Sequence, residues 1–142
     1  MDLILWRHAD AEDGAPDLAR KLTPKGVEQA ARMAAWLLKR LPKNAVVIAS
    51  PAVRAQQTAA ALGKKFLTEE SLAPGASVEA ILRAAKSGKT VVLVGHQPDL
   101  GRAAAYLVAG TQAEWSIEKA AAWWLTGEAP ARVKAVISAD LL

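Results

Sequence analysis

The sequence predicts an α/β fold of three layers, in which a mostly parallel central sheet carries helices on both faces and ends in a C-terminal antiparallel hairpin. Two observations predict it. Apolar runs of strand length alternate with longer segments of helix length over most of the chain. The last two apolar runs follow each other with no helix between them, which is typical of a hairpin.

The first strand and helix are predicted by one apolar run and one capped amphipathic segment. DLILW, at residues 2–6, is nearly continuously apolar, as the buried strands of parallel sheets are. In the segment that follows, Thr23 is a suitable N-cap and Pro24 a suitable first helical residue. An apolar face runs from Val27 to Leu41, and Pro42 ends the predicted helix.

The same alternation continues through the middle of the chain. A second buried strand is expected at 45–49, and Ser50 is expected to cap a helix that starts at Pro51 and ends at Gly63. A short extended piece is expected at 65–67.

The third part of the chain repeats the pattern and then departs from it. We expect a helix over 78–86, a strand over 90–95 and a helix from Pro98 towards Gly110. Two strands, at 120–125 and 133–139, then form the predicted hairpin.

Length and composition favour one domain over residues 1–142, since 52% hydrophobic residues suffice for one core. The chain has no cysteine, which excludes disulfides and thiolate metal sites and fits a cytoplasmic protein. We expect neither a signal peptide nor a membrane span. The net charge of +4 suits an anionic ligand, but scattered basic residues do not predict a nucleic-acid surface.

Unusual polar residues follow three of the predicted strands. Arg7 and His8 follow the first, Ser50 and Arg54 follow the second, and His96 follows the third. Ligands of open α/β sheets bind at the carboxyl ends of the strands, so these side chains are expected to meet in one crevice.

The residue types in this crevice predict a phosphate pocket. Two histidines are too few ligands for zinc, and neighbouring arginines would repel a dication, so we expect no metal. Arginine instead binds phosphate or carboxylate with its planar fork. Arg54 lies in the first turn of a predicted helix, where free N–H groups and the helix dipole attract anions.

Four segments resemble a known family. Arg7-His8-Ala9 resembles the Arg-His-Gly signature of the histidine phosphatase superfamily, and VLVGHQPDL resembles the segment around the family's second histidine. LTPKGVEQA and SPAVRAQQTA resemble its following helix and its Ser-Pro-x-x-Arg-x-x-x-Thr segment. The short length, RHADAE and GHQPDL are most similar to the SixA-type phosphohistidine phosphatases. The resemblance implies a phosphoglycerate mutase-like fold.

The resemblance also implies roles for individual residues. In the family the first histidine becomes phosphorylated and is released by water. Carried over, His8 is the nucleophile, while Arg7, Arg54 and His96 hold the phosphoryl oxygens, and no cofactor is needed. This agrees with elementary chemistry, because neutral imidazole is a good nucleophile near pH 7 and positive donors stabilise the equatorial oxygens.

The chain departs from the family pattern at two places. Ala9 replaces the usual glycine, and Pro74 stands nearest to the place where many relatives carry a proton-donating glutamate. Asp10, Glu12 and Asp99 are then the candidates for a proton donor, although loop capping or a helix-dipole interaction explains the two aspartates as well.

Three further residues are candidates for substrate binding. Ser50 is able to bind phosphate, although a helix cap explains it equally well. Gln97 follows His96 and is a candidate for lining the pocket, and Asp10 lies two residues after the nucleophile.

We therefore expect a metal-independent phosphatase that works through phospho-His8 on phosphohistidine of a protein. Leaving imidazole is protonated near neutral pH, so a dedicated acid matters less for this substrate. The alternatives are a small-molecule phosphomonoesterase acting on a sugar phosphate or similar ester, and a non-catalytic module that binds phosphate or phosphoproteins.

Overall fold

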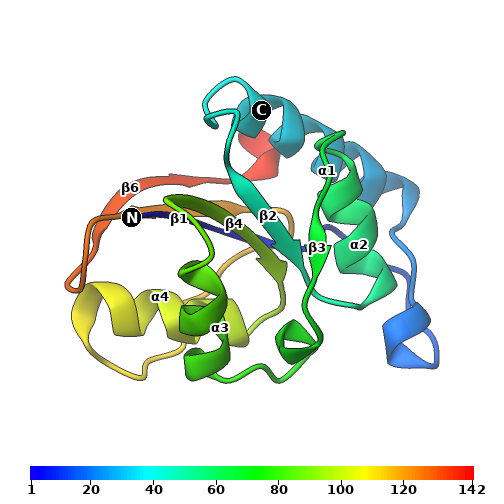
Figure 1. Cartoon of the computed structure of the whole chain (residues 1–142). Helices are drawn as coiled ribbons and strands as arrows, with labels where there is room; N and C mark the ends of the chain where they lie inside the picture. The colour runs from blue at the N-terminus through cyan, green and yellow to red at the C-terminus, as the bar shows by residue number, and fades with distance from the viewer.

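A computed structural model describes all of residues 1–142 and contains one six-stranded sheet in the order β3-β2-β4-β1-β5-β6 (Figure 1). Neighbouring strands among β1 to β4 pair in parallel, and the β5–β6 hairpin joins β1 in antiparallel fashion. The predicted α/β class and hairpin are confirmed. The strands are β1 (Asp2–Arg7), β2 (Val46–Ala49), β3 (Leu67–Thr68), β4 (Thr90–Gly95), β5 (Ala122–Thr126) and β6 (Arg132–Ile137).

Two helices cover each face of the sheet, as Figure 1 shows. Residues of β1 alternate between the two cores: Ile4 and Trp6 pack towards α1 and α2, whereas Leu3 and Leu5 pack towards α3 and α4. The helices are α1 (Pro24–Leu38), α2 (Val53–Ala60), α3 (Val78–Ala85) and α4 (Asp99–Ala109).

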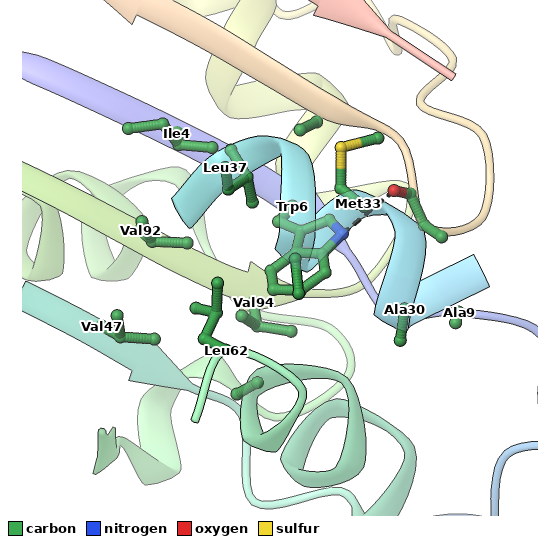
Figure 2. Packing of buried hydrophobic residues seen from close by; sticks show 14 of the residues in the cluster. Ile4, Trp6, Ala9, Ala30, Met33, Leu37, Val47, Leu62, Val92 and Val94 are labelled. Carbon is green, nitrogen blue, oxygen red and sulfur yellow. Dashed lines mark hydrogen bonds between the residues drawn. The ribbon is translucent and has the colours of Figure 1, made fainter. Parts of the chain in front are cut away.

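Trp6 is the largest fully buried side chain of the core between the sheet and helices α1 and α2, where it lies beside Met33 and Val94 (Figure 2). Its ring nitrogen donates a hydrogen bond of 3.0 Å to the carbonyl oxygen of Ala120. This bond satisfies the polar atom of a buried indole and fastens the segment before β5 to the end of β1.

The helix α1 begins as predicted and ends earlier. Thr23 is its N-cap, and the Thr23 hydroxyl accepts the N–H of Gly26 at 3.0 Å. The helix ends at Leu38 rather than Leu41. Val27 and Leu38, which lie within the predicted apolar face, are 55% and 44% exposed, because the buried side of the helix is formed by Gly26, Ala30, Met33, Ala34 and Leu37.

The start of α2 corrects a second prediction. The helix begins at Val53 with Ala52 as its N-cap, so Ser50 does not cap it. The Ser50 hydroxyl accepts the N–H of Ala52 at 3.1 Å in the preceding turn. It also contacts the ring of His96, which follows β4.

Three short 3-10 helices were not predicted: η1 (Asp17–Ala19), η2 (Glu70–Leu72) and η3 (Ala139–Leu141). The last of these takes the end of the predicted final strand and packs on α1. No helix is both long and apolar enough to cross a membrane.

Candidate active site

The site lies where β1, β2 and β4 end. The sheet register places Arg7 opposite Gly95 and Ala49 opposite Val94, so the residues that follow these strands emerge at one edge. The His8 N–H donates to the carbonyl oxygen of Gly95 at 3.0 Å, which extends the β1–β4 pairing by one residue. His8, Ser50 and His96 therefore meet, as predicted from their places after the strands.

The two histidine rings face each other inside the protein. Their centroids lie 5.1 Å apart with the planes tilted by 53°. His8 is 7% exposed and His96 is 3% exposed. The rings thus form one buried pair at the base of the site.

The hydrogen bonds of His8 fix its tautomer. Its Nδ1 lies 2.8 Å from the carbonyl oxygen of Ala9, and a carbonyl only accepts, so Nδ1 carries the proton. Arg54 Nε donates to His8 Nε2 at 3.3 Å. The lone pair of Nε2 therefore accepts a hydrogen bond from the guanidinium group inside the site.

Arg54 is the central cation of the site and is 3% exposed. Besides His8, its Nη2 lies 3.5 Å from His96 Nδ1. Asp17 holds the guanidinium from the other side: its carbonyl oxygen accepts from Nη1 at 2.8 Å and its carboxylate accepts from Nη2 at 3.1 Å. Arg54 therefore connects α2 to η1 and to the residues that follow β1 and β4.

Thr58 fastens the helix that carries Arg54 to the loop that carries His8. Its hydroxyl donates to the Arg54 carbonyl oxygen at 2.7 Å and accepts the N–H of Ala9 at 3.1 Å. The position of Arg54 relative to His8 is therefore set by a buried hydrogen bond as well as by packing.

His96 and Ser50 form a second buried contact. Since Arg54 donates towards His96 Nδ1, the proton of the neutral ring lies on Nε2, which donates to the Ser50 hydroxyl at 2.7 Å. Ser50 thus belongs to the site through His96.

Arg7 supplies a donor that has no protein partner. Its Nη1 donates to the carbonyl oxygen of Ile117 at 2.9 Å, whereas its Nε is buried and unpaired. An unpaired buried donor of a guanidinium suits an anion that enters the site.

Burial keeps both histidines neutral. Burial lowers the pKa of His8 to about 4, opposed by its hydrogen bond to Ala9 and reinforced by the positive charges of Arg54 and Arg7. Burial, together with His8 and Arg54, lowers the pKa of His96 to about 3. At neutral pH the site therefore holds two neutral imidazoles and two guanidinium groups.

The chain contains no group of three or more histidine, aspartate or glutamate side chains placed to hold a metal ion. The polar groups that meet here are donors, or rings with one donor and one acceptor. Such a set fits the oxygens of a phosphoryl group.

Comparison with known proteins supports the same assignment. Residues 3–75 match the family model described as the histidine phosphatase superfamily, branch 1. An uncharacterized protein of Mycobacterium tuberculosis is 34% identical over 116 residues, which cover 75% of this chain and 73% of that protein. The chain belongs to the histidine phosphatase superfamily.

Two solved structures resemble this histidine phosphatase over nearly its whole length. A candidate phosphohistidine phosphatase SixA from Nakamurella multipartitia is 31% identical, with a TM-score of 0.79 over 96% of this chain and 94% of that one. The protein histidine phosphatase SixA complexed with tungstate shares the fold, with 24% identity and a TM-score of 0.84 over 99% of both chains.

The side-chain amide of Gln97, a candidate for lining the pocket, has both of its polar atoms engaged within the protein. Its amide N–H donates to the carbonyl oxygen of Trp115 at 2.9 Å, and its oxygen accepts the N–H of Gly101 at 2.7 Å. The side chain is thus occupied by closing the first turn of α4 and by fixing the loop before β5.

Asp10 has both carboxylate oxygens engaged. Lys119 donates to one at 2.8 Å and Thr23 to the other at 2.7 Å. These two hydrogen bonds lower the pKa of Asp10, so it is an ionised group that fastens a loop to the start of α1.

Asp99 and Glu12 offer no better proton donor. Asp99 is 2% exposed and accepts the N–H groups of Gly75 and Ala76 at 2.9 and 3.0 Å. Burial raises its pKa, but the carboxyl group makes no hydrogen bond to His8, His96 or Arg54 and instead binds the loop at Gly75 and Ala76. Glu12 lies exposed on the loop after His8, with no side-chain hydrogen bond.

Asp17 is the site residue that the sequence did not reveal. It begins η1, in the segment GAPDLAR, which has no periodicity or motif that distinguishes Asp17 from Asp13. Only the folded chain brings this segment against the first turn of α2.

Proposed function

We propose that this histidine phosphatase hydrolyses phosphohistidine on a protein through a covalent intermediate on His8. One observation carries the proposal: Nδ1 of His8 carries the proton that the Ala9 carbonyl accepts, so the lone pair is on Nε2, where it accepts a hydrogen bond from Arg54 Nε. A neutral imidazole with a directed lone pair is a competent nucleophile at neutral pH.

In the proposed first step, Arg54 Nε donates to a phosphoryl oxygen in place of His8 Nε2. The Nε2 lone pair then forms a bond to phosphorus while the bond to the leaving nitrogen breaks. The bonding electrons go to the leaving ring. Arg7 Nε and the Arg54 guanidinium donate to the equatorial oxygens, where charge is spread in the transition state. Water then attacks phospho-His8, releases phosphate and restores the neutral ring.

The substrate class follows from the surrounding carboxyl groups. The carboxylate of Asp10 is ionised and doubly engaged, and that of Asp99 is buried. An alcohol leaving group needs a proton in the transition state, whereas an imidazole that carries a proton on its other nitrogen leaves as a neutral molecule. Asp17, the carboxylate that contacts Arg54, has a lowered pKa and is ionised as well. A site without a protonated carboxyl group in contact with the leaving group therefore favours phosphohistidine.

The first experiment tests the intermediate. Wild-type protein quenched during turnover of ³²P-labelled phosphohistidine peptide is expected to carry acid-labile, base-stable label, and His8→Ala is expected to carry none and to lose turnover. Undiminished turnover in folded His8→Ala would exclude the mechanism. Stoichiometric binding of phosphate compounds without turnover by the wild type would instead identify a binding module.

The same protein then tests the substrate class. We expect kcat/KM for phosphohistidine, corrected for the uncatalysed rate, to exceed that for an alkyl phosphate by at least about 10²-fold, the usual lower value of general-acid help. Equal corrected efficiencies, lowered by Asp10→Asn or Asp99→Asn, would show that an acid operates and would identify a general phosphomonoesterase.

A further inference from the structure

Asp17 places a negative charge at the mouth of a site built for anions. One of its carboxylate oxygens accepts from Arg54 Nη2 at 3.1 Å and the other accepts from Arg20 Nε at 3.0 Å. The Asp17 side chain is 56% exposed, whereas that of Arg54 is 4% exposed. The carboxylate thus lies between the buried guanidinium and solvent.

Holding Arg54 in place does not require this charge. The main-chain carbonyl of Asp17 already accepts from Arg54 Nη1 at 2.8 Å, and Thr58 fixes the Arg54 backbone. A neutral amide at position 17 would supply the same acceptor to Nη2. The carboxylate charge also repels a dianionic phosphate ester, so it calls for an explanation other than positioning.

Phosphohistidine differs from a phosphate ester in the charge of its leaving group. Its ring has a second nitrogen, which is protonated below a pKa near that of ordinary histidine, about 6.5. The protonated ring is a cation with an outward N–H donor, and it reduces the net charge of the group by one. A carboxylate acceptor at the mouth of the site is complementary to such a ring.

We propose that the Asp17 carboxylate accepts a hydrogen bond from the free ring N–H of the phosphorylated histidine and so selects this leaving group over an alcohol. The inference rests on the proposed function. Arg54 connects the nucleophile to Asp17: its Nε contacts the nucleophilic nitrogen of His8 and its Nη2 contacts the Asp17 carboxylate.

The step balances without an external acid. His8 Nε2 forms its bond to phosphorus, the electrons of the breaking P–N bond neutralise the departing imidazolium, and the ring keeps its second proton. Asp17 stays ionised throughout, since its hydrogen bonds from Arg54 and Arg20 lower its pKa. Its charge stabilises the ring in the protonated form that leaves most readily.

The test compares Asp17→Asn with Asp13→Asn, which removes an equal charge from an exposed position in the same loop. The probes are a phosphohistidine peptide and phenyl phosphate. For Asp17→Asn we expect the ratio of kcat/KM on the peptide to kcat/KM on phenyl phosphate to fall about tenfold, the difference expected between a charged and a neutral acceptor. For Asp13→Asn we expect the wild-type ratio.

A pH profile separates selection from mere positioning. Turnover of the peptide should decline as the pH rises and the bound ring loses its proton. Asp17 raises the pKa of that ring, so Asp17→Asn should move the decline to lower pH by about one unit. Phenyl phosphate has no such ring and should show no corresponding shift.

Three results would overturn the inference. Equal losses on both substrates with an unshifted profile would mean that Asp17 only positions Arg54, and unchanged kinetics would mean that it does neither. A wild-type protein that turns over phenyl phosphate but not the peptide would overturn the proposed substrate class as well. In that case the failure is visible before any variant is made.

Discussion

His8 and His96 are buried as neutral rings, and their burial makes folding stability depend on pH. Their pKa values are about 4 and about 3 in the folded protein, against about 6.5 in an unfolded chain. Between pH 6.5 and 4 the unfolded state binds more protons, so stability is full above pH 6.5 and is lost as the pH falls.

This linkage gives a prediction for His96→Gln, which removes one titrating ring. In wild type each ring contributes a slope of up to about 1.4 kcal/mol per pH unit, and the variant should lose one such contribution. Urea unfolding at pH 7, 6 and 5 measures the slope. An identical slope in the variant would mean that His96 is not neutral in the folded protein.

Residue types at strand ends made much of the site predictable, because parallel strands present their carboxyl ends at one edge. Arg7, His8 and His96 were found in this way. The roles of Asp17 and Gln97 were not, because each is decided by contacts with residues far along the chain. A single polar side chain in a loop gives no signal of such contacts.

At the scale of elements, local signals succeeded where neighbours alone decide the structure. Thr23 and Pro24 start α1 as predicted, because an N-cap is satisfied within its own turn. The predicted start of α2 was wrong. The Ser50 hydroxyl, which was expected to cap that helix, instead contacts His96 at the edge of the sheet and accepts the N–H of Ala52 in the preceding turn. A tertiary contact there displaces a local preference.

The first turn of α1 supports the loop after the nucleophile, and this gives a prediction for Gly26→Ala. A Cβ at this position would lie 2.0 Å from the Asp10 carbonyl oxygen. We expect a loss of about 1–3 kcal/mol in stability, although alanine is the better helix former. Urea unfolding measures it, with Val27→Ala, on the exposed side of the same turn, as the control that stays within about 0.5 kcal/mol of wild type. Equal stabilities of the two variants would contradict the close packing.

For the whole molecule, alternating apolar runs were enough to predict the class of fold, because strand and helix periods are local properties. The strand order was not predicted. β4 pairs with both β1 and β2, although many residues separate them along the chain. This pairing brings the two histidines together, so the sequence indicated a shared edge but not which strands are adjacent.

Because the site joins the ends of β1, β2 and β4 to α2 and the loop at Asp17, an oxyanion bound there should stabilise the entire fold. Tungstate resembles the phosphoryl group in the transition state, and we expect it to bind only the folded chain. At 100 times its Kd it should therefore add about 2.7 kcal/mol to the free energy of unfolding. Thermal melting with and without tungstate measures the effect. Arg54→Ala, which removes the buried guanidinium, should abolish it, whereas Arg102→Ala, an exposed arginine paired with Glu114, should retain it.

Both the stabilisation and the turnover should persist in EDTA, since the donors that meet the anion are arginine and histidine side chains. Loss of turnover in EDTA with recovery on adding zinc would show that the anion is held by a metal rather than by Arg7 and Arg54.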